Sequence, residues 1–124
     1  EKYRISDRYG YRTHPISGER QFHAGLDMAA VYAATVHAAA SGTVTFAGET
    51  PGYGKTVVVT HRFGFQTRYA HLTLIYTRKG AKVEKGDVIG FVGSTGISTG
   101  NHLHYEVIKN QKRINPLNFI YGTK

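Results

Sequence analysis

The stretch Asn101-His102-Leu103-His104-Tyr105-Glu106 follows a loop rich in glycine, serine and threonine and precedes a short apolar run. In a β-strand the side chains alternate between two faces, so residues two apart point the same way. The two histidines and the glutamate are therefore expected on one face, with the leucine and the tyrosine on the other. Two imidazoles on one strand face are either half of a metal site or two exposed histidines that bind nothing, and this stretch alone leaves both interpretations open.

Short β-branched or aromatic runs recur along the chain, and glycine-rich turns separate them. Short strand-forming runs that are separated by turn residues at regular intervals predict an all-β domain. No long amphipathic helix is expected. The expected strands are Thr43–Ala47, Lys55–His61, Phe65–His71, Val88–Val92 and His102–Ile108.

Three segments are harder to interpret. Met28–Ala40 is rich in alanine but shows no helical face, so we expect a loop followed by a strand. Lys79–Gly96 has the rhythm of a hairpin, with its turn at Lys85-Gly86-Asp87. Ser6–Phe22 mixes glycine, proline, arginine and aromatic residues and predicts an extended, loop-rich segment, which either lines a substrate groove or is an ordinary surface loop.

The composition limits the possible functions. A chain of 124 residues forms one domain, so residues 1–124 are treated as a single unit. Cysteine is absent, which excludes disulfides and thiolate zinc sites. The net charge of +8 favours anionic partners, but the basic residues are spread along the chain and form no dedicated nucleic-acid arm. The sequence has no apolar run of transmembrane length and no signal-peptide pattern, and because it begins without Met we expect a piece of a longer protein.

A second group of possible metal ligands lies in His23-Ala24-Gly25-Leu26-Asp27. Gly25 permits a bent backbone, so His23 and Asp27 can converge on one ion. Two imidazoles and one carboxylate make three protein ligands and leave a fourth position for water, as a catalytic zinc site requires.

These motifs together resemble the M23 family of zinc metallopeptidases, the lysostaphin- and LytM-type peptidoglycan endopeptidases. The resemblance spans nearly the whole chain. Its most specific part is the run Val-Gly-Ser-Thr-Gly-x-Ser-Thr-Gly-x-His-Leu-His, which ends at His104. It implies a mainly β fold, an antiparallel β-sheet single domain of the LytM/lysostaphin type whose long loops form a groove. The motifs that carry it are His23-x-x-x-Asp27, Tyr69-Ala70-His71-Leu72 and His102-x-His104, in that order.

The resemblance also implies roles for five residues. His23, Asp27 and His104 would bind Zn²⁺, and His71 and His102 would be the catalytic histidines that flank the attacking water. No His-Glu-x-x-His motif is present, so a histidine must transfer the proton. We favour His102 as the base and His71 as the group that stabilises the oxyanion, although the sequence is equally compatible with the reverse.

Further residues are expected around the groove. Arg8 or Arg12 would pair with a substrate carboxylate. Glu106 is either a partner that orients a ligand histidine or an exposed strand residue. The full set expected to contact substrate is Arg8, Arg12, His14, Tyr69 and Asn101. The two histidines inside predicted strands, His37 and His61, are expected to be packing or surface residues.

The implied function is a zinc-dependent peptidoglycan hydrolase of the periplasm or cell envelope. It would cleave peptide bonds in stem peptides or cross-links, and the lead-in Ser6–Gly18 is similar to that of Gram-negative members, which indicates D-Ala–diaminopimelate bonds. Endopeptidase activity is expected, and added carboxypeptidase activity stays open. An N-terminal autoinhibitory segment or a partner protein would regulate it.

The first alternative function is a catalytically silent domain that binds the wall or activates a hydrolase. The second, a basic β-barrel that binds nucleic acid, would leave the histidine constellation unexplained.

Two departures from the usual family pattern are visible. After Asp27 the segment Ala30–Val36 lacks the two prolines and the glycine that are common there. Asn101 stands where proline is often found before His-Leu-His. Neither change removes an expected ligand.

Overall fold

The computed structural model describes residues 4–7, 10–13, 20–23, 26–29, 32–95, 102–110 and 112–115, with side chains from residue 32 onward. Over these residues the chain forms twelve β-strands and one short 3-10 helix, η1 (Arg62–Gly64). The strands are β1 (Arg4–Asp7), β2 (Gly10–Thr13), β3 (Arg20–His23), β4 (Leu26–Ala29), β5 (Thr35–His37), β6 (Gly42–Thr50), β7 (Gly54–Thr60), β8 (Phe65–Ile75), β9 (Lys82–Val83), β10 (Val88–Val92), β11 (His102–Lys109) and β12 (Lys112–Ile114). The predicted mainly β, antiparallel architecture is confirmed.

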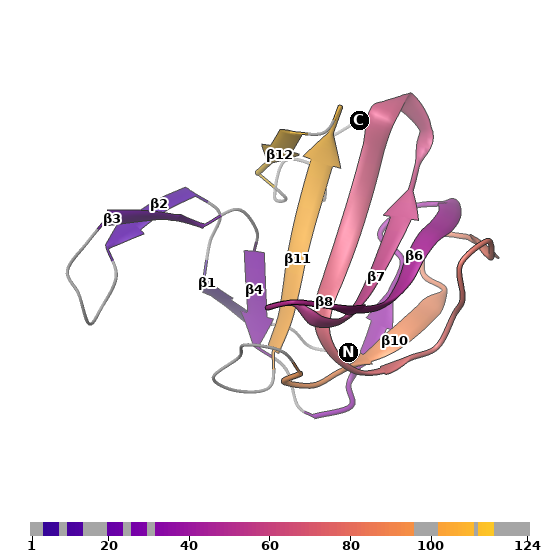
Figure 1. The fold of residues 1–124 in the computed structure, drawn as a ribbon, viewed down its shortest axis with the longest axis horizontal. Helices are drawn as coiled ribbons and strands as arrows, with labels where there is room; N and C mark the ends of the chain where they lie inside the picture. Colours follow the sequence, from indigo (N-terminus) through magenta and orange to yellow (C-terminus); the bar gives the residue numbers. More distant parts are fainter. Residues whose placement is uncertain are drawn as a thin grey trace.

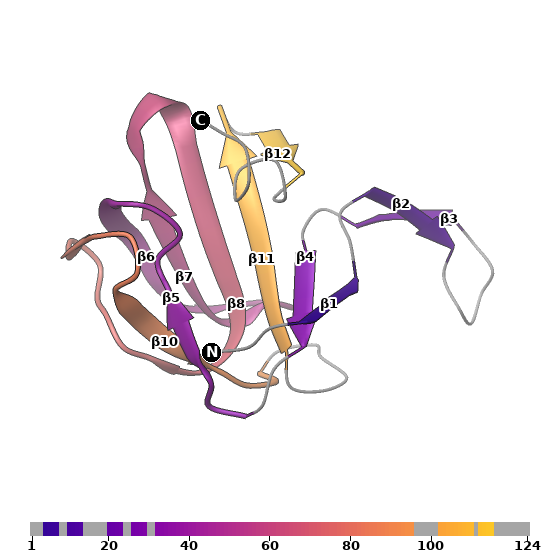
Figure 2. The same ribbon diagram turned by 180° about the vertical axis from the view of Figure 1, so that it is seen from behind.

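One large sheet holds most of the strands, and every pairing in it is antiparallel. Its central path runs β1-β4-β11-β8-β7-β6-β9. The long strands β11, β8, β7 and β6 lie side by side in a curved layer, with β4 and β1 continuing it beyond β11 (Figure 1). The hairpin of β2 and β3 forms its own small sheet and projects away from the large one on the side of β1 and β4 (Figure 2).

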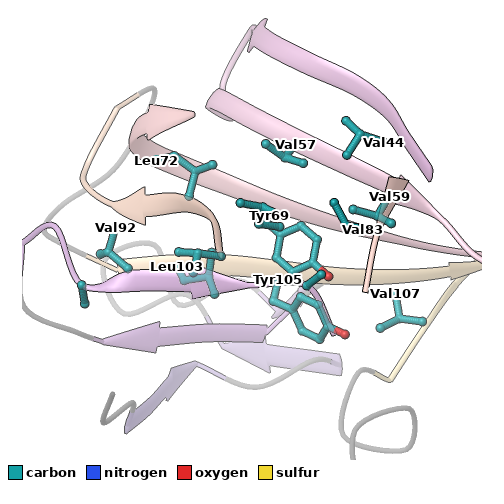
Figure 3. Close-up of a cluster of buried hydrophobic side chains, with 14 residues drawn as sticks. Val44, Val57, Val59, Tyr69, Leu72, Val83, Val92, Leu103, Tyr105 and Val107 are labelled. Carbon is teal, nitrogen blue, oxygen red and sulfur yellow. The ribbon is translucent and has the colours of Figure 1, made fainter. Parts of the chain in front are cut away.

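The core lies on one side of β11 and β8. Alternate residues of β11 (Leu103, Tyr105 and Val107) are at most 4% exposed, and they pack with residues such as Tyr69 of β8 (Figure 3). Full burial of one aliphatic side chain contributes about 1.5–3 kcal/mol, which fixes the register of β11. The strand period therefore directs His104 and Glu106 away from these apolar residues, as the sequence predicts.

Strand β8 changes partner at His71. Its first part, Phe65–Ala70, pairs with β11, and its last part, Leu72–Ile75, pairs with β10. The register with β7 also shifts here: the step from Val57 to Lys55 is two positions on β7, whereas the matching step from Tyr69 to Leu72 is three positions on β8. One extra residue of this kind is a β-bulge, which bends a strand and re-aims its side chains.

The predicted hairpin in Lys79–Gly96 is wrong. The turn around Gly86 exists, and Asp87 Oδ2 accepts a hydrogen bond from Glu84 N–H at 2.8 Å. However, β9 pairs with β6, whereas β10 pairs with β5 and β8. The turn could be predicted because it depends on neighbouring residues. The strand with which each flanking segment pairs depends on parts of the chain far away in the sequence.

Two other expectations have mixed outcomes. The segment Met28–Ala40 contains the end of β4 and then β5, so a strand does follow a loop there. Ser6–Phe22 is more regular than expected, because β2 and most of β3 fall inside it. Among the described residues, no helix has the length and apolar character needed to cross a membrane.

Candidate active site

Three of the predicted histidines meet where β8 lies beside β11. His104 is the register partner of Ala70, the residue before His71. The ring centroids of His71 and His102 are 5.0 Å apart, and those of His71 and His104 are 6.0 Å apart. His71 is 6% exposed and His104 9%, so both rings are largely removed from solvent. Segments far apart in the sequence thus supply one compact cluster of imidazoles.

His71 occupies the bulge in a left-handed backbone conformation, with φ of 64°. Such a conformation costs a non-glycine residue about 1–3 kcal/mol. Its backbone is held on both sides: His71 N–H donates to Tyr53 O at 2.8 Å, and Gly93 N–H donates to His71 O at 3.1 Å. The bulge therefore fixes the position of the His71 ring.

The ring of His71 is also fixed, because Nδ1 lies 2.6 Å from the carbonyl oxygen of Thr95. A carbonyl oxygen only accepts hydrogen bonds, so Nδ1 must carry the proton. The neutral ring then has its lone pair on Nε2.

Gly93 permits the loop after β10 to approach β8. A Cβ atom placed on Gly93 would lie 2.6 Å from Thr73 Cβ and 2.7 Å from Thr73 N. No real side chain fits that space. Glycine is therefore required for the hydrogen bond to His71 O and for the approach of Thr95 to His71.

A buried carboxylate supports His104. The ring donates from Nε2 to Glu106 Oε2 at 2.9 Å, and Tyr53 Oη donates to the same oxygen at 2.8 Å. Arg68 and Arg113 each donate to Oε1 at 3.0 Å. Burial raises the pKa of Glu106, but the hydrogen bonds from His104 and Tyr53 and the charges of His104 and Arg113 lower it to about 2. Glu106 is 1% exposed, so of its two predicted roles the exposed one is wrong.

A cavity of about 270 Å³ opens at this cluster. Tyr53 lines it, and its ring lies tilted beside that of His104 with the centroids 5.7 Å apart. The Arg68 guanidinium lies over the Tyr53 ring, 4.8 Å from the ring centroid. Tyr53 was not predicted from the sequence, although an aromatic residue in the turn Pro51-Gly52-Tyr53-Gly54 is a usable signal. The lining residues are Pro51, Gly52, Tyr53, His71, His104 and Glu106.

The other two predicted metal ligands are described only by their backbones. Asp27 on β4 is the direct register partner of His104 on β11. His23 ends β3 and is paired with Gly10. Among the side chains that are described, no group of three possible ligands is complete.

The described part of the site is compatible with zinc. Because Nε2 of His104 donates to Glu106, the lone pair of the neutral ring lies on Nδ1, where a metal ion can bind it. Residues directly opposite in an antiparallel pair lie close enough to reach one ion, which suits Asp27 and His104. Two imidazoles and one carboxylate are a donor set that catalytic zinc accepts.

The residues expected to contact substrate have different outcomes. Tyr69 requires a correction: it is 2% exposed, and its hydroxyl bonds Ala39 N and Thr67 Oγ1 within the core, so a peptide outside cannot reach it. Arg12 lies on β2 opposite Gln21. Arg8, His14 and Asn101 lie outside the described residues.

The two remaining described histidines do not line the cavity. His37 is exposed, and its Nδ1 lies 2.8 Å from Gly86 O. His61 links Ser41 O and Thr67 Oγ1 at 2.8 and 2.7 Å. Both are surface or packing residues, as the sequence predicts.

Comparisons with known proteins agree with this architecture. The sequence profile of Peptidase family M23 matches residues 21–116. A DD-carboxypeptidase/endopeptidase Mpg of Neisseria meningitidis is 48% identical over 120 residues, which cover 97% of this chain. The chain spans 28% of the length of that relative.

Solved structures give the same result. The catalytic domain of lysostaphin from Staphylococcus simulans superposes with a TM-score of 0.87 at 29% identity, covering 97% of this chain and 93% of that one. A zinc-containing peptidase from Vibrio cholerae has a TM-score of 0.84 at 33% identity, covering 98% of this chain and 37% of that one.

Proposed function

Because this chain belongs to peptidase family M23, we propose that it is a zinc-dependent peptidoglycan hydrolase domain that cleaves peptide bonds in wall stem peptides or cross-links. The observation that carries the proposal is the cluster of His71, His102 and His104 at a cavity, beside the register pair of His104 with Asp27. An ionised, buried Glu106 behind His104 adds to it, because a histidine that binds a metal ion almost always donates its other ring N–H to such a partner.

The chain's own residues would hold the metal ion. His23, Asp27 and His104 are the proposed ligands. Zn²⁺ bound there would polarise the scissile carbonyl and lower the pKa of water, which makes water a usable nucleophile at neutral pH. Glu106 would keep the His104 ring oriented and its Nδ1 lone pair available.

His71 and His102 would carry out the proton transfers. Both lie beside His104 without being proposed ligands, and their ring centroids are 5.0 Å apart. One of them accepts a proton from the attacking water and passes it to the leaving amine, while the other stabilises the developing oxyanion. The low exposure of the site strengthens these electrostatic interactions.

The proposed substrate follows from the relatives and from charge. The similar Mpg protein bears the name of a DD-carboxypeptidase/endopeptidase, which supports cleavage of D-Ala–diaminopimelate cross-links and trimming of terminal D-Ala. The net charge of +8 suits an anionic wall polymer, and Arg12 would pair with a substrate carboxylate. Such a substrate places the protein in the periplasm or cell envelope.

Mass spectrometry of muropeptides before and after digestion tests the activity and identifies the bond. We expect loss of cross-linked dimers, no cleavage after a chelator, and recovery with Zn²⁺. His71→Ala should abolish cleavage while zinc content stays stoichiometric. His37→Ala is the matched control, because His37 lies outside the cavity, and it should remain fully active.

Two results would contradict the proposal. Full activity of His23→Ala would exclude the zinc assignment. A folded protein that contains no zinc and cleaves no muropeptide would instead favour the silent wall-binding or activator domain.

A further inference from the structure

Thr95 connects three separate parts of the site. Its hydroxyl donates to Leu72 O on β8 at 2.6 Å and accepts from Lys55 N–H on β7 at 3.0 Å. Its carbonyl oxygen accepts from His71 Nδ1 at 2.6 Å. One residue of the loop after β10 is thus tied to both strands at the bulge and to the catalytic ring.

The hydroxyl has a specific place in the sheet. Lys55 and Leu72 are register partners at the end of the shift that places His71 in the bulge. At this point the hydrogen-bond ladder between β7 and β8 is irregular, and the Thr95 hydroxyl connects the Lys55 N–H of β7 to the Leu72 carbonyl oxygen of β8. Its one proton and one of its lone pairs are both used, so the hydroxyl holds the residue in one orientation.

The carbonyl of Thr95 is therefore held where the His71 ring needs it. The backbone just before Thr95 is also held in place, because Gly93 N–H donates a hydrogen bond to His71 O and no side chain at position 93 would fit against Thr73. Removal of the hydroxyl would take away both side-chain hydrogen bonds that tie Thr95 to the described strands β7 and β8. The proton on Nδ1 of His71 would then lose a fixed partner.

We propose that Thr95 is a positioning residue that locks His71 as the Nδ1–H tautomer and so makes its Nε2 the proton acceptor of the reaction. This rests on the proposed hydrolase function. It assigns proton acceptance to His71 and oxyanion stabilisation to His102, the reverse of the division that the sequence favoured. A serine–histidine protease orients its histidine by the same principle, with a carboxylate in place of the carbonyl.

The proton transfers balance without a further reactant. Water forms its bond to the scissile carbonyl carbon and gives one proton to His71 Nε2. The ring becomes an imidazolium, and its Nδ1–H stays on the Thr95 carbonyl. When the C–N bond breaks, Nε2 gives that proton to the leaving amine, and the neutral ring is restored.

A pair of substitutions separates the hydroxyl from the rest of Thr95. Thr95→Val keeps the shape but removes both hydrogen bonds, and we expect kcat to fall about 100-fold with little change in KM, because a misplaced catalytic group costs about that much. Thr95→Ser keeps the hydroxyl and should retain kcat to within about 5-fold. Thr67→Val is the matched control. It also removes a buried hydroxyl with two partners, His61 and Tyr69, but it lies away from the cavity, so kcat should not change.

Nitrogen NMR of the histidine rings supplies a readout that does not depend on activity. In metal-free wild-type protein, His71 should carry its proton on Nδ1, and Thr95→Val should give a mixture of tautomers. A wild-type His71 protonated on Nε2 would overturn the proposal, even if Thr95→Val failed to fold. Wild-type kcat in a folded Thr95→Val would overturn it too. If the protein cleaves no muropeptide at all, the proposed function fails while the tautomer measurement still decides the role of Thr95.

Discussion

His104 donates a hydrogen bond from Nε2 to the Glu106 carboxylate, 2.9 Å away, and Glu106 is 1% exposed. The two residues are two apart on β11, so one strand supplies both the ring and its buried partner. This pair determines which nitrogen of His104 can bind a metal ion.

Glu106→Gln should weaken zinc binding about 10- to 100-fold, because a neutral amide orients His104 less firmly and raises its basicity less. Competition with a chromophoric chelator measures the affinity directly. Glu49→Gln is the matched control, since Glu49 is exposed on β6, and it should leave the affinity unchanged. Equal affinities of Glu106→Gln and wild type would show that the carboxylate has no influence on the metal.

The stability of the metal-free protein should fall in acid partly because of Glu106. Its folded-state pKa is about 2, below the ordinary 4.5. A depressed pKa contributes stability above the unfolded-state value, and this contribution is lost as the pH falls from about 4.5 to about 2. The loss should be about 3 kcal/mol. Urea unfolding at about pH 5 and about pH 2.5 should therefore show a larger difference for wild type than for Glu106→Gln. Equal differences would contradict the depressed pKa.

Two buried tyrosines should respond in opposite ways to loss of the hydroxyl. Among the described residues, Tyr105 Oη is the buried side-chain polar atom without a hydrogen-bond partner. The Tyr69 hydroxyl bonds Ala39 N and Thr67 Oγ1. Tyr105→Phe should be neutral or stabilise by up to about 1 kcal/mol, whereas Tyr69→Phe should cost about 1–3 kcal/mol. Denaturant unfolding of the pair measures both, and a cost for Tyr105→Phe equal to that of Tyr69→Phe would refute the distinction.

Gly93→Ala should destabilise the protein by about 1–3 kcal/mol, because the new methyl group would overlap Thr73. It should also lower activity, since Gly93 N–H bonds the backbone of His71. Gly48→Ala is the control: its Cβ would lie 3.5 Å from Phe46 Cζ, an ordinary contact, and stability should change by less than about 0.5 kcal/mol. Thermal unfolding and muropeptide digestion of both variants test the prediction. A stable, active Gly93→Ala would show that the loop can move aside.

Much of the fold was predictable because strand alternation is a local property. The apolar residues Leu103 and Tyr105 face the core, and His104 and Glu106 take the other face, as the period of two requires. The turn at Gly86 was also predictable, because a turn depends on residues that are neighbours in the sequence. The partners of the flanking strands were not, because pairing of β9 with β6 brings together segments that the local sequence does not connect.

The mainly β class, the M23 motifs in their order and the histidines that gather at the site were predictable from the amino-acid sequence, because these depend on residue identity and short spacings. The remaining features depend on how the strands pack together. The tertiary structure placed Tyr69 in the core, made Glu106 a buried partner and brought Tyr53 to the cavity. It also joined Thr95 to His71, through the bulge at which β8 exchanges β11 for β10. Burial depth and the tautomer of a histidine depend on atoms contributed by several strands, and no single stretch of chain contains that information.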